Sequence, residues 1–64
     1  MKVKEILGII SWGQRLSIMK LENEEGREIF SDLNFRTNLD EETKNLRVIN
    51  IFAEDNWLTI WVKD

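Results

Sequence analysis

Carboxylates are the side chains of this 64-residue chain that are best suited to chemistry, and they gather in three runs. The runs hold Glu22, Glu24, Glu25 and Glu28, then Asp40, Glu41 and Glu42, and finally Glu54 and Asp55. If the runs met in the fold, they would suit a hard cation such as calcium, or an acidic surface that imitates DNA. None has the alternating ligand spacing and internal glycine of an EF-hand loop. Solvated turns and helix starts are the simpler interpretation.

Several chemistries are excluded by residue types that the chain lacks. It contains no histidine and no cysteine, so Ser-His or Cys-His catalysis, zinc sites and disulfides have no residues to form them. A catalytic carboxylate pair needs a cleft that shifts one pKa, and a chain this short has little interior for one. We therefore expect no enzyme activity, cofactor, metal or small-molecule substrate.

Charge and hydropathy predict a small cytoplasmic protein. The net charge is −3 and the basic residues are scattered, whereas nucleic-acid binding normally needs a basic stripe. The apolar run near the N-terminus is too short, and too interrupted by Gly8, to span a membrane, and no signal cleavage site follows it. We expect one soluble domain over residues 1–64, near the lower size limit for independent folding.

Residues 47–63 alternate in the manner of a β-hairpin around Asp55 and Asn56, a pair that tolerates a two-residue turn. In this register one face is aliphatic, with the pairs Ala53 and Leu58, Ile51 and Ile60, and Ile49 and Val62. The other face is aromatic and mixed, with the pairs Glu54 and Trp57, Phe52 and Thr59, Asn50 and Trp61, and Val48 and Lys63. We expect the aliphatic face to be core.

A second hairpin is predicted over residues 15–31, with a four-residue loop at 23–26. This loop would pair Glu22 with Arg27, Lys20 with Ile29, and Met19 with Phe30. Leu16, Ile18, Ile29 and Leu33 would then share one face, and Met19, Leu21 and Phe30 the other.

Two helices are predicted. Val3, Ile6, Leu7 and Ile10 form one apolar stripe of a helix that would end near Gly13, although Val3, Glu5, Leu7 and Ile9 also alternate as in a strand. In the second helix Asn38 and Glu41 fit a capping box, with Phe35, Leu39 and Leu46 as its apolar contacts.

The expected fold is therefore α+β: N-terminal helix, β-hairpin, short helix and β-hairpin, forming a four-stranded antiparallel sheet with a helix on one face. The N-terminal helix would cover the aliphatic residues Leu16, Ile18, Ile29, Ile49, Ile51, Leu58, Ile60 and Val62. This layout, with its opening VKEILGII and closing RVINIFAEDNWLTIWV, resembles short uncharacterised proteins of phages and integrative elements in low-G+C Gram-positive bacteria. The resemblance implies a small accessory protein of a mobile element.

The aromatic face is the candidate binding site. We expect its interaction residues to be Trp57, Trp61, Phe52, Phe30 and Met19. An exposed apolar patch usually marks an interaction site, and tryptophan is enriched in binding hot spots, so the predicted function is protein-protein contact as an adaptor or inhibitor. The alternatives are a homodimer through this face, a stacking platform for single-stranded nucleic acid, or a second small core in which Phe35, Leu39 and Leu46 cover the face.

Overall fold

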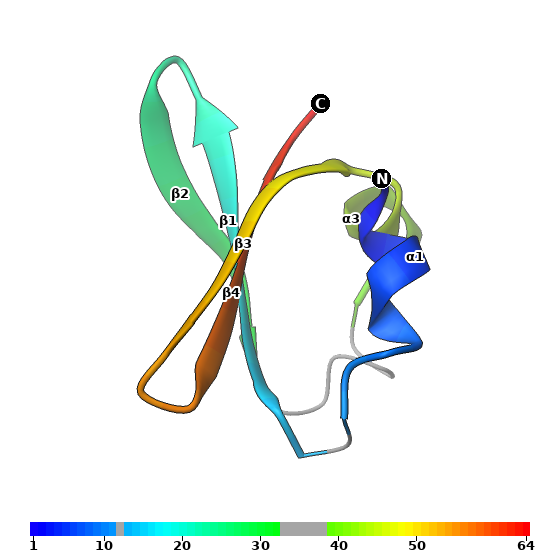
Figure 1. Cartoon of the computed structure of the whole chain (residues 1–64). Coiled ribbons are helices and arrows are strands. Elements are labelled where there is room, and N and C mark those ends of the chain that lie inside the picture. The colour runs from blue at the N-terminus through cyan, green and yellow to red at the C-terminus, as the bar shows by residue number, and fades with distance from the viewer. Residues whose placement is uncertain (12, 33–38) are drawn as a thin grey trace.

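The computed structural model describes residues 1–11, 13–32 and 39–64 (Figure 1). Six elements follow one another along the chain: α1 (Val3–Leu7), β1 (Arg15–Glu22), β2 (Glu25–Asp32), α3 (Glu41–Lys44), β3 (Arg47–Glu54) and β4 (Trp57–Lys63). The strands form one four-stranded sheet, and both helices lie on the same side of it. The predicted α+β class is confirmed at this level, with two short helices on one face where a single covering helix was predicted.

The sheet is mixed, which corrects the prediction of a purely antiparallel one. Its strand order is β2-β1-β4-β3, and the two central strands, β1 and β4, are parallel. Parallel neighbours cannot be joined by a tight turn, and here the chain runs from β1 to β4 through β2, α3 and β3. Alternation within each hairpin does not specify which of its two edges meets the other hairpin, so this arrangement was not readable from the pattern.

The core lies between the helices and the central strands. Its buried residues are Val3, Ile6, Leu7, Ile10, Leu16, Ile18, Leu39, Leu46, Ile60 and Val62. The predicted stripe of the first helix is confirmed as buried, but the helix ends at Leu7 with Gly8 as its C-cap, well before Gly13. The main-chain N–H of Val3 donates to the carbonyl of Leu46, 3.0 Å away, which fixes α1 beside the end of α3.

The second helix is capped by a residue other than the one predicted. Asp40 is its N-cap, and its Oδ1 accepts a hydrogen bond of 2.9 Å from the main-chain N–H of Thr43. The predicted cap Asn38 lies outside the described residues. The Thr43 hydroxyl and main-chain N–H both hydrogen-bond the Asp40 carboxylate, and they lower its pKa.

The second hairpin forms as predicted over most of its length. Asp55 and Asn56 make a two-residue turn with φ angles of 50° and 68°. The cross-strand pairs next to it are those predicted, beginning with Glu54 opposite Trp57 and continuing as far as Asn50 opposite Trp61. A bulge then intervenes at Ile49. The last predicted pairs are therefore wrong: Val48 lies opposite Val62, and Arg47 opposite Lys63.

The first hairpin has a shorter turn than predicted. Asn23 and Glu24 form it alone, with φ angles of 49° and 69°, so that Glu22 lies opposite Glu25. A bulge between the Ile18 and Met19 pairs then brings Phe30 opposite Ile18. The predicted pair of Met19 and Phe30 is therefore wrong by one residue. A shift of one residue places the Phe30 side chain on the opposite face of the sheet from the one predicted.

Strand β3 extends beyond the helix layer, which corrects its predicted place in the core. Ile49 and Ile51 are each 41% exposed, although Ile51 lies opposite the fully buried Ile60. The reason is the strand order, because β3 is an edge strand and α1 packs over the centre of the sheet. A groove of about 300 Å³ separates α1 from β3, and its lining includes Ile9 and Ile51.

Candidate interaction surface

The side of the sheet away from the helices carries the aromatic residues of β4. Along this strand Ile60 and Val62 are fully buried under the helices, so the alternate residues Trp57 and Trp61 lie on the opposite side. We call this side the open face, because no described element covers it. The following described residues lie on it: Arg15, Ser17, Met19, Leu21, Gly26, Glu28, Ser31, Arg47, Asn50, Phe52, Glu54, Trp57, Thr59, Trp61 and Lys63.

Trp61 is held against its neighbours by a close approach to β2. Met19 is its direct neighbour on β1, and its ring reaches past that strand to Gly26. A Cβ added at Gly26 would overlap the six-membered ring of Trp61 and would lie 3.5 Å from Cε of Met19. The glycine therefore makes room for the indole, and Trp61 is half-buried without any covering layer.

Trp57 is bordered by charged and hydroxyl groups. The guanidinium of Arg15 lies 5.9 Å from the centre of its ring, within the range of a cation-π contact. A shallow depression beside it is lined by Ser17, Glu28, Ser31, Trp57 and Thr59. The open face therefore offers two half-buried indoles with polar groups between them and along one side.

Phe52 and Met19 complete the predicted interaction residues on this face. Phe52 lies opposite Thr59 on the edge strand and is 43% exposed, and Met19 is half-buried beside Trp61. Four of the five predicted residues are thus brought together on the open face: Trp57, Trp61, Phe52 and Met19.

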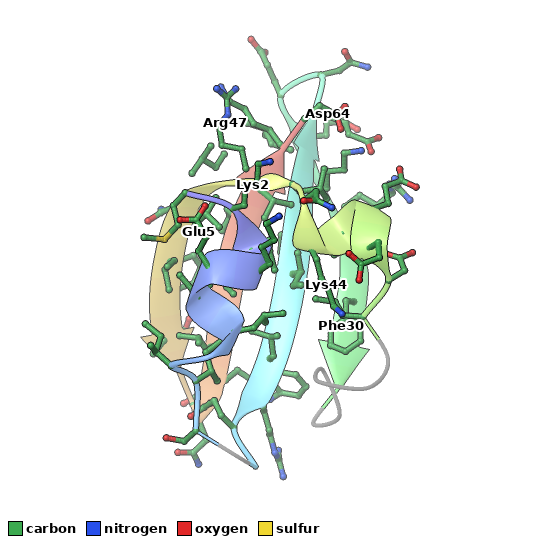
Figure 2. All side chains as sticks on the ribbon, turned by 90° about the vertical axis from the view of Figure 1, so that its right-hand side faces the viewer. Lys2, Glu5, Phe30, Lys44, Arg47 and Asp64 are labelled. Atoms are coloured by element: carbon green, nitrogen blue, oxygen red, sulfur yellow. The ribbon has the colours of Figure 1, made fainter. Side chains whose placement is uncertain are left out.

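Phe30 is the exception, and its predicted place on the aromatic face is corrected. It lies opposite Ile18 and packs against the core, on the helix side of the sheet. Figure 2, which looks onto that side, shows its ring below α3. The cause is the bulge in the first hairpin, which changes the face on which the residues of β2 after Glu28 lie.

The hydrophobic residues around α3 leave the open face uncovered. Leu39 and Leu46 belong to the core on the helix side, so the predicted alternative in which they fold across the aromatic residues is wrong for these two. Phe35, the third residue of that alternative, lies outside the described residues.

The carboxylate runs do not converge. Because β1 and β4 are parallel, the turn after β1 and the turn before β4 lie at opposite ends of the sheet. In the first run Glu22 is paired locally: Arg27 donates a 2.7 Å hydrogen bond to it and lowers the pKa of that carboxyl, while Lys20 lies 3.7 Å from it. Among the described residues, no cluster of three carboxylates is placed to hold a metal ion.

Pattern reasoning missed two parts of this surface. Gly26 was taken as a loop residue, although a glycine inside a strand is itself a sign of a close approach. The stacking of Arg15 on Trp57 depends on the parallel pairing of β1 and β4, which no local pattern indicates.

The chain was compared with known proteins, and no protein family, curated protein or solved structure matches it. Within residues 1–11, 13–32 and 39–64, no helix has the length and apolar character needed to cross a membrane.

Proposed function

We propose that this chain is a non-enzymatic interaction module that binds another protein through its open face. The observation that carries the proposal is the position of Trp57 and Trp61 on a face that no described element covers, while the core lies wholly on the other side. Tryptophan buries a large area at low conformational cost, and it is enriched in the residues that dominate binding energy.

The surroundings of the two indoles suit a protein partner. Trp61 is supported by Met19 and by the space above Gly26, so little side-chain freedom remains to be lost on binding. Ser17 and Thr59 lie between the two indoles. The charged residues Arg15 and Glu28 lie beside the indoles. An apolar centre with a polar rim is the usual anatomy of a protein interface.

A single-stranded nucleic-acid platform is the second candidate, and the stacked Arg15 and Trp57 pair favours it. The charges on the same face oppose it, because Glu28 and Glu54 offset two of its three basic residues, Arg15, Arg47 and Lys63. Tracking a phosphate backbone requires a basic stripe, so the protein partner is the better supported function.

The test is affinity capture from a lysate of the source cells with three baits: wild type, Trp61→Ser and Phe52→Ser. We expect one protein to be retained by the wild type and lost by both variants. Phe52 lies on the edge strand and is 43% exposed, so its replacement should disturb the fold less than Trp61→Ser. Cooperative unfolding of each bait is measured beside the capture.

The matched control is Ile9→Ser, which removes an apolar side chain that is 82% exposed on the helix side of the sheet. It should retain the same protein as the wild type. Equal capture by all four baits, or loss of capture by Ile9→Ser alone, would contradict a site on the open face.

Compartment and origin complete the proposal. The lack of cysteine suits a reducing compartment, and we propose the cytoplasm. An accessory role in a phage or integrative element rests on the resemblance of the sequence pattern alone.

A further inference from the structure

The two outer strands of the sheet differ in how they protect their edges. β2 carries the charged residues Glu25, Arg27 and Glu28 along its length. β3 has a stretch with no charged side chain, from Val48 to Ala53. Proteins usually guard an exposed strand edge with charges, proline or a covering segment, because the unpaired main-chain groups are a template for another strand.

Exposed apolar side chains gather at the β3 edge. Among the described residues, all the large exposed apolar side chains except Leu21 lie on or beside this strand: Met1, Ile9, Ile49, Ile51 and Phe52. The groove between α1 and β3 runs alongside them. Both sides of the edge are therefore apolar, since Ile51 is on the helix side and Phe52 on the open face.

Part of this edge is already paired by the chain itself. The main-chain N–H of Val48 donates a hydrogen bond of 2.7 Å to the carbonyl of Met1, and the main chains of Lys2 and Arg47 pair as an isolated antiparallel β-bridge. Beyond Val48 no described segment pairs with the outer side of β3. The available edge therefore begins at Ile49 and ends at the turn.

The geometry of the turn determines which main-chain N–H and C=O groups of β3 point outward at this edge. In a two-residue hairpin the flanking pair, Glu54 and Trp57, exchanges both hydrogen bonds, and the pairs alternate from there. The N–H and C=O groups of Ala53 and Ile51 therefore point away from β4. The N–H of Ile51 donates instead to Oδ1 of its neighbour Asn50, 2.9 Å away, as expected for a donor with no strand beside it.

The charges at the two ends of β3 have opposite signs. Arg47 lies at its start with Lys2 beside it, as Figure 2 shows, and Glu54 and Asp55 lie at its end. Two copies of such a strand placed antiparallel bring each basic end against an acidic end. A parallel arrangement would place like charges together, so the charge pattern selects the antiparallel pair.

We propose that β3 pairs antiparallel with β3 of a second copy of this chain, with the two-fold axis close to Ile51 and Phe52. The two sheets then form one continuous sheet of eight strands, and the apolar side chains at the edge pack across the axis beside the two grooves. This pairing shares Phe52 with the open face but uses neither indole, so Trp61→Ser separates it from the proposed function.

The first test is the mass of the protein in solution, measured by sedimentation equilibrium over a range of concentrations. The wild type should be a dimer that dissociates on dilution. Ile51→Lys places two lysines near the axis and should be monomeric throughout, while the matched apolar-to-lysine control Leu21→Lys should dimerise like the wild type. A monomeric wild type, or loss of the dimer in Leu21→Lys with retention in Ile51→Lys, would overturn the proposal.

Hydrogen exchange identifies the contact independently. The amide of Ala53 points to solvent in the monomer, so it should be protected in concentrated wild type and should lose that protection on dilution and in Ile51→Lys. A dimer in which the Ala53 amide exchanges rapidly would assign the contact to another surface. Trp61→Ser should keep the dimer, which separates this result from the test of the open face.

A charge exchange covers the case in which Ile51→Lys does not fold. Arg47→Glu and Glu54→Lys alter exposed residues, and each alone should weaken the dimer roughly five- to tenfold at low salt. The double variant should recover most of the wild-type affinity, because the ends remain complementary with their signs exchanged. Additive weakening in the double variant would contradict the antiparallel pairing.

Discussion

The indole ring of Trp61 in β4 lies over Gly26 in β2, with strand β1 between them. We predict that Gly26→Ala leaves the strand intact but forces the ring away, because the new Cβ overlaps it. The expected loss is about 1–3 kcal/mol of unfolding free energy, typical of an overpacked site. Tryptophan emission should also shift to longer wavelength and be quenched more strongly by acrylamide.

The control for this variant is Gly8→Ala. No atom lies within 4 Å of a Cβ built there, and Gly8 has right-handed helical angles that alanine adopts freely. Its expected effect is a gain of about 0.4–1 kcal/mol without a change in emission. If both alanine variants left the emission unchanged, the contact between Trp61 and Gly26 would not exist in solution.

A second prediction compares two isoleucines that lie opposite each other. Ile60→Ala should cost about 2–5 kcal/mol, because Ile60 is fully buried in the centre of the sheet. Ile51→Ala should cost roughly 1 kcal/mol, because its side chain is already 41% exposed at the edge. Denaturant unfolding of dilute protein, which keeps the chain monomeric, measures both. Equal losses would mean that β3 is covered.

The difference between Ile60 and Ile51 marks the limit of what the sequence alone predicts about burial. Alternation along β4 predicted which of its residues share a face, because the period of a strand is two and the aromatic and aliphatic residues separate cleanly. The same alternation made Ile51 look like Ile60. Only the strand order distinguishes the edge from the centre, and that order depends on contacts between residues far apart in the chain.

Phe30 shows the second limit of the sequence pattern. Its face is determined by one bulge in β2, between the residues paired with Met19 and Ile18. A two-residue turn in place of a four-residue turn shifts the pairing by two residues and leaves every side chain on its predicted face, whereas the extra residue in the bulge shifts the pairing by one and moves the ring to the other side of the sheet. Alternation therefore predicted the face of Trp57, Trp61, Phe52 and Met19 correctly, and it was wrong for Phe30 because no local pattern indicates the bulge.

A third prediction concerns the cap of α3 and its dependence on pH. The folded pKa of Asp40 is lowered by its hydrogen bonds to Thr43, so the stabilisation is fully present above the unfolded pKa of an aspartate and is lost as the pH falls through the lowered value. Asp40→Asn keeps an oxygen acceptor but cannot titrate. The difference in unfolding free energy between wild type and Asp40→Asn should therefore shrink in acid. A difference that stays constant with pH would contradict the charged cap.

Asp40→Ala separates the hydrogen bond from the charge. It removes the acceptor for the Thr43 N–H, so its stability should fall below that of Asp40→Asn at every pH. Thermal unfolding followed by circular dichroism measures all three proteins. Equal stability of the alanine and asparagine variants would mean that the cap contributes nothing beyond its charge.

The last prediction separates a protein-binding surface from a nucleic-acid platform. Glu28 and Glu54 lie on the open face with Arg15, Arg47 and Lys63, so a phosphate backbone laid across the indoles would meet two repelling carboxylates and no basic stripe. We expect oligothymidine to leave the tryptophan emission of the wild type unchanged at physiological salt. The variant Glu28→Gln with Glu54→Gln removes the repulsion and should show quenching that weakens with added salt. Quenching of the wild type that is salt-sensitive and lost in Trp57→Phe would instead favour stacking of bases on the open face.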